Sequence, residues 1–220
     1  MQNTRVKICC IRSVAEAELA VRSGASAVGL VSAMPSGPGV ISEERIARIA
    51  ATIPPGVASF LLTSLQSASA IIEQQKRLCV NTLQLCDRLV EGTYGELRQS
   101  LPGVSLVQVI HVRGEDSLAE AMEVAPAVDA ILLDSGNPQS AVKQLGGTGR
   151  RHDWNLSRRI RESVRAPIYL AGGLRPENVA EAIDTVQPFS VDVCSGVRTH
   201  DRLDESKLAA FFDAVRDVAQ

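Results

Sequence analysis

Two glycine-containing pairs in the last third of the chain have residue types suited to binding an anion. Gly172-Gly173 and Ser195-Gly196 each directly follow a short apolar run. Glycine lets the backbone approach a ligand closely, so that main-chain N–H groups can donate to phosphate oxygens. A single pair would equally fit a tight turn. Two pairs after two successive runs predict a site for a phosphorylated small molecule.

The first apolar run, Val6–Cys10, contains a lysine and two cysteines. Successive side chains of a strand point to opposite faces, so Lys7 and Cys9 share one face and Cys10 lies on the other. A lysine in an apolar strand is costly unless it finds a partner in the interior. We therefore expect Cys9 to face inward with Lys7, and Cys10 to pack toward a helix.

These residues belong to an alternation of short apolar runs and longer helical patterns along the whole chain. The expected strands are Val6–Cys10, Ala27–Val31, Val57–Leu62, Thr82–Leu85, Ser105–His111, Ala130–Asp134, Ile168–Ala171 and Ser190–Cys194. The expected helices are Val14–Ser23, Glu43–Thr52, Ser67–Arg77, Gly95–Ser100, Ser117–Ala125, Asn155–Val164, Pro176–Asp184 and Glu205–Val218. Such alternation requires right-handed crossovers and a parallel sheet.

Two α/β architectures fit this pattern, a doubly wound open sheet and a (β/α)8 TIM barrel. Eight strand–helix units, and no Gly-x-Gly-x-x-Gly after the first strand, favour a single-domain (β/α)8 barrel over residues 1–220. Closure of a barrel sets the first and last strands side by side, so Asp192 is the expected partner of Lys7. Barrel active sites lie at the carboxyl ends of the strands, where Asp134 ends the sixth strand and the glycine pairs follow the seventh and eighth.

Composition excludes several classes of function. The chain has 25 acidic and 23 basic residues and only 3% aromatic residues, which leaves no basic footprint for nucleic acid or an anionic membrane. Its five cysteines show no C-x-x-C pair and no histidine at ligand spacing, so neither a metal site nor a disulfide framework is expected. The N-terminus lacks a signal-peptide core. We expect a cytoplasmic protein with reduced thiols.

Five segments together resemble the phosphoribosylanthranilate isomerase family. They are Lys7-Ile8-Cys9, Ile131–Ser135, Gly146–Gly149 with Asp153-Trp154, Leu170–Leu174 with Pro176–Val179, and Val191–Val197. The resemblance runs from residue 5 to the last helix and is thin between residues 33 and 112. It implies a (β/α)8 barrel, an isomerase of tryptophan biosynthesis, and an Amadori rearrangement that requires no cofactor.

The resemblance also implies roles for individual residues. Cys9 matches the family's general base and Asp134 its general acid, with Lys7 and Asp192 in support. A thiol with a pKa near 8.5 suits proton abstraction near neutral pH. Asp134 has to be kept protonated by burial or by a nearby negative charge. The residues that the resemblance implies for binding the substrate phosphate are Gly172, Gly173, Ser195 and Gly196. Taken singly, Cys9 would also fit a small core residue and Asp134 a helix cap.

Several positions depart from the family pattern. Cys10 stands where the family usually has Gly, and Arg198 where it has an acidic residue. The segment Ser36–Val40 lacks the Arg that contacts the anthranilate carboxylate, Cys86-Asp87 replaces His-Gly, and Gln108 corresponds to a common Lys. Most departures fall on the side that holds the aromatic half of the substrate. The candidates to replace the missing cation are Arg12, Arg150, Arg151 and Arg198.

Three functions remain open at this point. The first is phosphoribosylanthranilate isomerase itself, and the second is an isomerase of the same family with a different amino-sugar phosphate. The third is a non-catalytic phosphometabolite-binding protein, which has no need of an acid and a base. The sequence does not choose between a monomer and a homodimer. A redox role for Cys9-Cys10 is disfavoured because adjacent cysteines on a strand bridge poorly.

Overall fold

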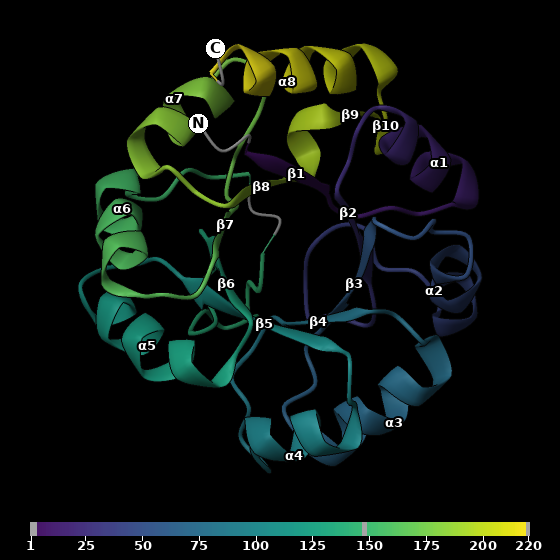
Figure 1. The fold of residues 1–220 in the computed structure, drawn as a ribbon, viewed down its shortest axis with the longest axis vertical. Helices are drawn as coiled ribbons and strands as arrows, with labels where there is room; N and C mark the ends of the chain where they lie inside the picture. The colour runs from purple at the N-terminus through teal and green to yellow at the C-terminus, as the bar shows by residue number, and fades with distance from the viewer. Residues whose placement is uncertain (1–3, 147–148, 219–220) are drawn as a thin grey trace.

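The protein is a closed barrel in a computed structural model that describes residues 4–146 and 149–218. Within these residues eight parallel strands follow one another around the ring in chain order, and β1 pairs with β8 (Figure 1). The strands are β1 (Arg5–Ile8), β2 (Ala27–Val31), β3 (Ala58–Thr63), β4 (Thr82–Leu85), β5 (Ser105–His111), β6 (Ala130–Asp134), β7 (Ile168–Leu170) and β8 (Ser190–Val193). The predicted (β/α)8 barrel is confirmed, and β1–β8 pairing excludes the open sheet.

Helices cover the outside of the barrel. They are α1 (Val14–Arg22), α2 (Glu43–Ala50), α3 (Ala68–Leu78), α4 (Tyr94–Ser100), α5 (Asp116–Val124), α6 (Trp154–Ser163), α7 (Val179–Val186) and α8 (Glu205–Asp217). Short 3-10 turns occupy Ala125–Ala127 and Ser195–Val197, and β9 (Arg198–Thr199) pairs with β10 (Arg202–Leu203). None of the helices described is long and apolar enough to cross a membrane.

Local side-chain caps explain where several helices begin. Ser42 accepts a hydrogen bond from the backbone N–H of Arg45, so α2 begins as its sequence predicts. The expected helix over Pro176–Asp184 instead begins at Val179. Asn178 is the reason, because its side-chain oxygen accepts from the N–H of Arg175 and holds the preceding residues in a turn.

Alternating side chains of the strands divide the core into two layers. Leu30 and Ile8 belong to the larger layer between barrel and helices. Phe60, Val107 and Leu132 fill the barrel interior. Because the strands are buried on both faces, they read as nearly continuous apolar runs.

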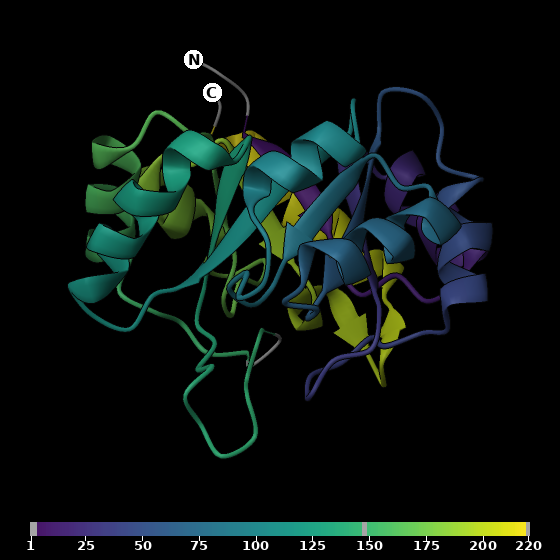
Figure 2. The ribbon, with the colours of Figure 1, turned by 90° about the horizontal axis from the view of Figure 1, so that it is seen from below.

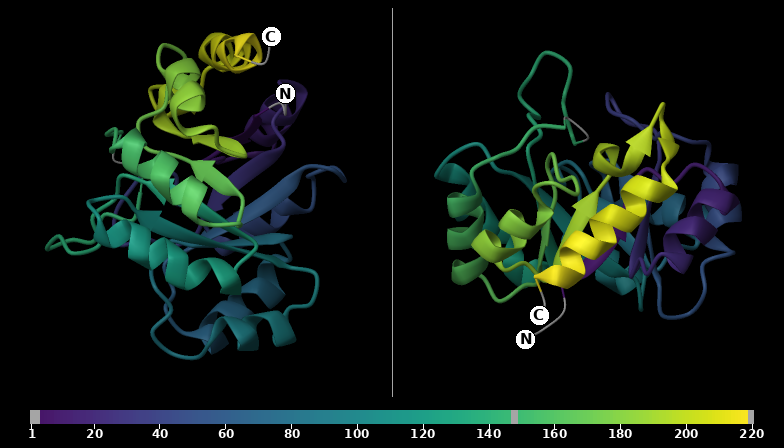
Figure 3. Two further views of the ribbon diagram at one scale, coloured as in Figure 1. Left: turned by 60° about the vertical axis from the view of Figure 1, so that its left-hand side comes forward. Right: turned by 90° about the horizontal axis from the view of Figure 1, so that it is seen from above.

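The loops that follow the strands gather at one end of the barrel. Figure 2 shows loop residues 135–146, the loop after β2 and the β9–β10 ribbon at the end opposite the chain termini. The right-hand view of Figure 3 shows the same arrangement from the other side. This carboxyl end of the strands is where a barrel places its chemistry.

Candidate active site at the carboxyl end of the barrel

Lys7 projects into the barrel and pairs with Asp192, as the sequence predicts. The register of β1 on β8 sets the two residues opposite each other, and the Lys7 Nζ lies 2.9 Å from a carboxylate oxygen of Asp192. Both side chains are buried, with Lys7 fully inaccessible. Burial alone would lower the pKa of Lys7, but the charge of Asp192 and the neighbouring Cys9 hold it above its ordinary value. The structure thus places a fixed positive charge under the mouth of the barrel.

Cys9 lies above this charge, on the same inner face. A Cβ atom at Gly29 on β2 would stand 2.9 Å from the Cys9 Sγ and 3.1 Å from the Lys7 Nζ, so only glycine leaves room for both side chains. The adjacent Cys10 side chain lowers the pKa of Cys9. The charge of Lys7 acts in the same direction and burial opposes it. A lowered pKa favours the thiolate, which is the form that accepts a proton.

Cys10 does not pack toward a helix, and that prediction is wrong. Regular β1 ends at Ile8, and Cys10 adopts a positive φ of 61°, so strand alternation no longer applies to it. Its thiol points to the carbonyl oxygen of Pro38 at 3.7 Å and lines the same pocket as Cys9 and Cys194. Those two cysteines, together with burial, raise the pKa of Cys10 well above its ordinary value. Cys10 therefore contributes a neutral thiol to the site.

Arg198 holds this unusual strand end in place from below. It donates to the carbonyl oxygens of Cys10 at 2.6 Å and Cys9 at 3.3 Å, and pairs with Glu16 of α1 at 3.0 Å. The Arg198 side chain is only 6% exposed. Its guanidinium is committed to these partners, so it does not replace the missing substrate-binding cation.

Asp134 ends β6 on another side of the mouth. One carboxylate oxygen accepts from the N–H of Ser135 at 2.7 Å, and the other faces Gly146 in the loop after β6. Cys9 and Asp134 both line one pocket, with about 680 Å³ of empty space including its part open to solvent. Within the described residues no hydrogen bond joins the two side chains. Cys9 and Asp134 therefore border the same space as two separate groups.

The two glycine pairs form the adjoining wall of the pocket. Gly172, Gly173 and Ser195 line it, and Gly172 and Gly173 have positive φ angles of 86° and 65°. Gly196 does not line the pocket itself. Instead, a Cβ there would stand 2.0 Å from the Leu174 carbonyl oxygen, so its bare backbone lets the loops after β7 and β8 pack together.

Comparisons with known proteins agree with this geometry. The family model described as N-(5'-phosphoribosyl)anthranilate (PRA) isomerase matches residues 6–214. This chain belongs to the phosphoribosylanthranilate isomerase family. Its relatives include N-(5'-phosphoribosyl)anthranilate isomerases of Methanocella arvoryzae and Methanothrix thermoacetophila, at 35% and 36% identity, each covering 97% of this chain and 98% of the relative.

Solved structures extend the family resemblance to three dimensions. Phosphoribosylanthranilate isomerase from Thermotoga maritima is 32% identical, covers 97% of this chain and 99% of its own, and superposes with a TM-score of 0.81. Another structure of the family, solved in complex with reduced 1-(o-carboxyphenylamino)-1-deoxyribulose 5-phosphate, is 30% identical with a TM-score of 0.78 and the same coverage. Of the segments that carried the resemblance, Gly147 and Thr148 lie outside the described residues.

Two of the departures from the family pattern, Ser36–Val40 and Cys86-Asp87, lie at the other end of the pocket, where residues at or just after the carboxyl ends of β2, β3 and β4 form the wall. Val31, Met34, Pro38, Leu62 and Cys86 make this wall largely apolar. Burial raises the pKa of the Cys86 thiol, so it is neutral. This end of the pocket suits an aromatic ring in contact with apolar atoms.

Gln108 does not belong to the pocket, contrary to the expectation that it replaces a site lysine. Its side chain accepts a hydrogen bond from the Tyr94 hydroxyl of α4 at 2.8 Å and donates to the Leu85 carbonyl oxygen. Since Val107 and Val109 face the interior, Gln108 faces the helices.

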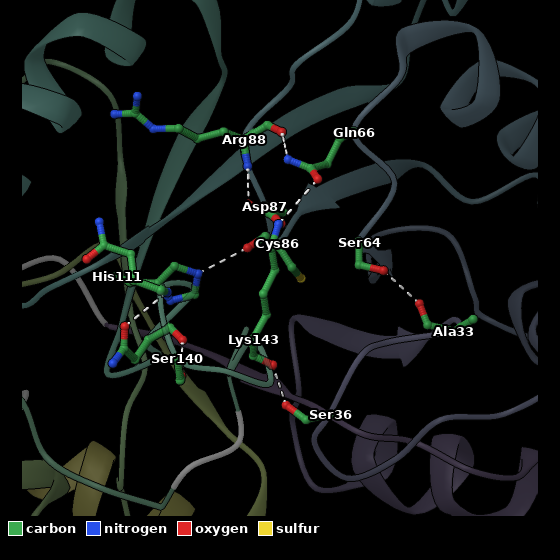
Figure 4. Close-up of polar contacts among 12 residues, drawn as sticks. Ala33, Ser36, Ser64, Gln66, Cys86, Asp87, Arg88, His111, Ser140 and Lys143 are labelled. Carbon is green, nitrogen blue, oxygen red and sulfur yellow. Dashed lines mark hydrogen bonds and ion pairs between the residues drawn. The ribbon is translucent and has the colours of Figure 1, made fainter.

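A lysine that sequence reasoning missed lies at the rim of the apolar end. Lys143, in the loop after β6, forms an ion pair with Asp87 and contacts the side-chain oxygen of Gln66 at 3.3 Å. Ser36 donates to the Lys143 carbonyl oxygen at 2.6 Å (Figure 4). Fifty-six residues separate Lys143 from Asp87, and no local pattern signals such a pair.

Proposed function

We propose that this protein catalyses the isomerisation of N-(5'-phosphoribosyl)anthranilate to 1-(o-carboxyphenylamino)-1-deoxyribulose 5-phosphate in tryptophan biosynthesis. The observation that carries the proposal is that Cys9 and Asp134, from β1 and β6, line one pocket whose wall includes Gly172 and Gly173. Family membership supports the same reaction. A binding protein has no need of an acid and a base at this position.

The proposed reaction begins at the ring oxygen of the sugar. Asp134 donates a proton to that oxygen, the bond between it and C1 breaks, and the open chain is a protonated Schiff base. Cys9 as thiolate then removes the proton from C2, and the electron pair of the C–H bond moves to neutralise the nitrogen. The resulting enolamine tautomerises to the 1-amino-1-deoxyketose. All bonds change within one molecule and its protons, so the chemistry needs no cofactor.

Lys7 supports these reaction steps without contacting the substrate. Its buried charge, held by Asp192, lowers the pKa of Cys9 and so favours the thiolate before the substrate is attacked. The adjacent thiol of Cys10 lowers the pKa of Cys9 as well. Both effects act on the base and neither acts on the acid.

The phosphate of the substrate fits the wall formed after β7 and β8. Gly172 and Gly173 bring backbone close to the pocket, and Ser195 begins a short 3-10 turn beside them. Asn178 donates to the Gly173 carbonyl oxygen at 3.0 Å and so holds this loop. With the phosphate at this wall, the aromatic ring extends toward the apolar end.

One observation favours a second candidate, an isomerase of the same family with a different amino-sugar phosphate. The segment Ser36–Val40 that lines the apolar end carries no cation for a carboxylate. Turnover of N-(5'-phosphoribosyl)anthranilate distinguishes the two candidates, because only the first has it as its substrate. We expect the purified protein to turn it over and to restore growth of a tryptophan auxotroph that lacks this isomerase. A folded protein that does neither would exclude the first candidate.

A further inference from the structure

The proposed substrate carries a negative charge at its aromatic end, and the pocket wall does not supply the opposite charge. Among the described residues that line the pocket there is no lysine or arginine. Lys7 lies beneath the wall and is already paired with Asp192. A cation for the aromatic carboxylate therefore has to come from the rim.

The arginines that the sequence suggests are occupied or lie elsewhere. Arg198 is bound to Glu16 and to the strand-end carbonyls. Arg151 stacks on the Trp154 ring at 3.7 Å and pairs with Glu181 of α7.

The other two arginines are placed by different contacts. The Arg150 backbone packs against Gly173 at the phosphate end, since a Cβ at Gly173 would stand 2.8 Å from the Arg150 carbonyl carbon. Arg12 lines a side pocket with Pro38, Cys194 and Ser195, and its guanidinium lies 3.7 Å from a carboxylate oxygen of Asp201. Arg12 is therefore already paired with an acidic residue outside the main pocket.

Lys143 is at the apolar end. Its backbone oxygen is held by Ser36, which lines the pocket, and Asp87 directly follows Cys86, which also lines it. Figure 4 shows the Lys143 side chain extending from the loop after β6 to Asp87 and Gln66. The side chain is 40% exposed, whereas that of Asp87 is 10% exposed. The Lys143 side chain is thus partly exposed at the rim of the apolar wall.

We propose that Lys143 binds the carboxylate of the substrate's aromatic ring and so selects carboxylated aglycones. This inference rests on the proposed function and assigns one of its specificity-determining residues. An ammonium group has three N–H donors. Asp87 and Gln66 each accept from it here, which leaves a donor for the ligand, and the carboxylate of the substrate competes with Asp87 for the same charge.

Competition with Asp87 makes the proposal distinguishable from a purely structural role. If Lys143 only tethers the loop after β6 to the end of β4, then removal of either partner breaks the same contact, and both variants change binding in the same direction. If Lys143 binds the ligand, Lys143→Met weakens binding, whereas Asp87→Asn frees the ammonium and strengthens it.

The experiment is calorimetric binding of two stable ligands to the full chain. One is reduced 1-(o-carboxyphenylamino)-1-deoxyribulose 5-phosphate, and the other is the same molecule without the carboxyl group. We expect Lys143→Met to weaken binding of the carboxylated ligand by about 10- to 100-fold and to leave the other within about twofold. Asp87→Asn should strengthen binding of the carboxylated ligand by a few fold. Lys76→Met, which breaks an exposed ion pair with Glu73 on α3, is the matched control and should change neither.

Two results would overturn the proposal. In the first, the unmodified protein binds both ligands equally well. In the second, Lys143→Met and Asp87→Asn weaken the binding of both ligands alike, which would mean that Lys143 only connects the loop after β6 to the end of β4. Turnover is measured separately, so a protein that discriminates between the ligands without isomerising the substrate would reject the proposed function and keep this assignment.

Discussion

The two ends of the pocket are built by different means. The phosphate end is made of backbone, with Gly172, Gly173 and Gly196 in two loops that are close in sequence and packed on each other. The apolar end is bordered by a rim of polar side chains that meet from four separate loops, with Ser36, Gln66, Asp87 and Lys143 joined by hydrogen bonds and an ion pair. Backbone recognition requires glycine at fixed positions, whereas a side-chain charge can be supplied from more than one loop.

The glycine pairs match the family pattern, whereas two of the departures from it, at Ser36–Val40 and Cys86-Asp87, lie at the ends of β2 and β4. Under the proposed function, a change at the glycine wall affects binding of any phosphorylated ligand, and a change at the apolar end affects which aglycone is bound.

The largest expected effect is on the chemistry that lies between the two ends. Cys9→Ala and Asp134→Asn should each lower kcat by about 10²- to 10⁴-fold, because each removes a positioned proton-transfer group. Binding of the reduced product analogue should change little. Cys79→Ala, at the exposed end of α3, is the control. Turnover that survives Cys9→Ala unchanged would refute the mechanism.

A smaller effect is expected from Gly173→Ala at the phosphate end. The new Cβ would lie 2.8 Å from the Arg150 backbone at a φ of 65°, so the loop has to shift. We expect binding of both calorimetric ligands to weaken by about tenfold or more. Gly103→Ala is the control, because Gly103 has a similar φ of 82° but a Cβ there would meet no atom within 4 Å. It shows how much of the effect comes from backbone strain and how much from steric crowding. If only the carboxylated ligand bound more weakly, the two ends of the pocket would not have the separate roles proposed here.

The Glu16–Arg198 pair beneath Cys9 should make stability depend on acidity. Burial alone would raise the pKa of Glu16, but hydrogen bonds from Arg198 and from backbone N–H groups lower it below its ordinary value. A carboxyl with a lowered pKa in the folded state stabilises the fold above its unfolded pKa, near 4.3. That contribution disappears as the pH falls through the folded value. In denaturant titrations, Glu16→Gln should be less stable than the unmodified protein at pH 7, and the difference should shrink below about pH 4. A difference that stays constant with pH would contradict the pKa direction.

The smallest effect is expected from Cys10→Gly. Glycine relieves the positive φ of 61°, while the loss of a buried thiol offsets that gain, so the free energy of unfolding should change by less than about 1 kcal/mol. Loss of the Cys10 thiol, which lowers the pKa of Cys9, should move the pH profile of Cys9 alkylation to higher pH. The alkylation rate measured against pH checks this, with Cys194→Ser as the comparison. An unchanged profile would show that Lys7 alone lowers the pKa of Cys9.

The barrel and the inward-facing residues of β1 could be predicted from the sequence. Alternating apolar runs and helical patterns are local signals, and closure of eight parallel strands sets β1 beside β8 by geometry alone. The pairing of Lys7 with Asp192 follows from these two facts. Glycine pairs after β7 and β8 are local as well, because close backbone approach excludes a side chain whatever the rest of the fold does.

The positions of the remaining charged groups and thiols could not be predicted from the sequence. Cys10 leaves strand alternation through a positive φ that is held by Arg198, and Arg198 in turn depends on Glu16, 182 residues away. The partner of Lys143 likewise comes from another loop. A long side chain on a loop can pair with many different groups, and which of them lies within reach depends on distances that are fixed only when the barrel closes.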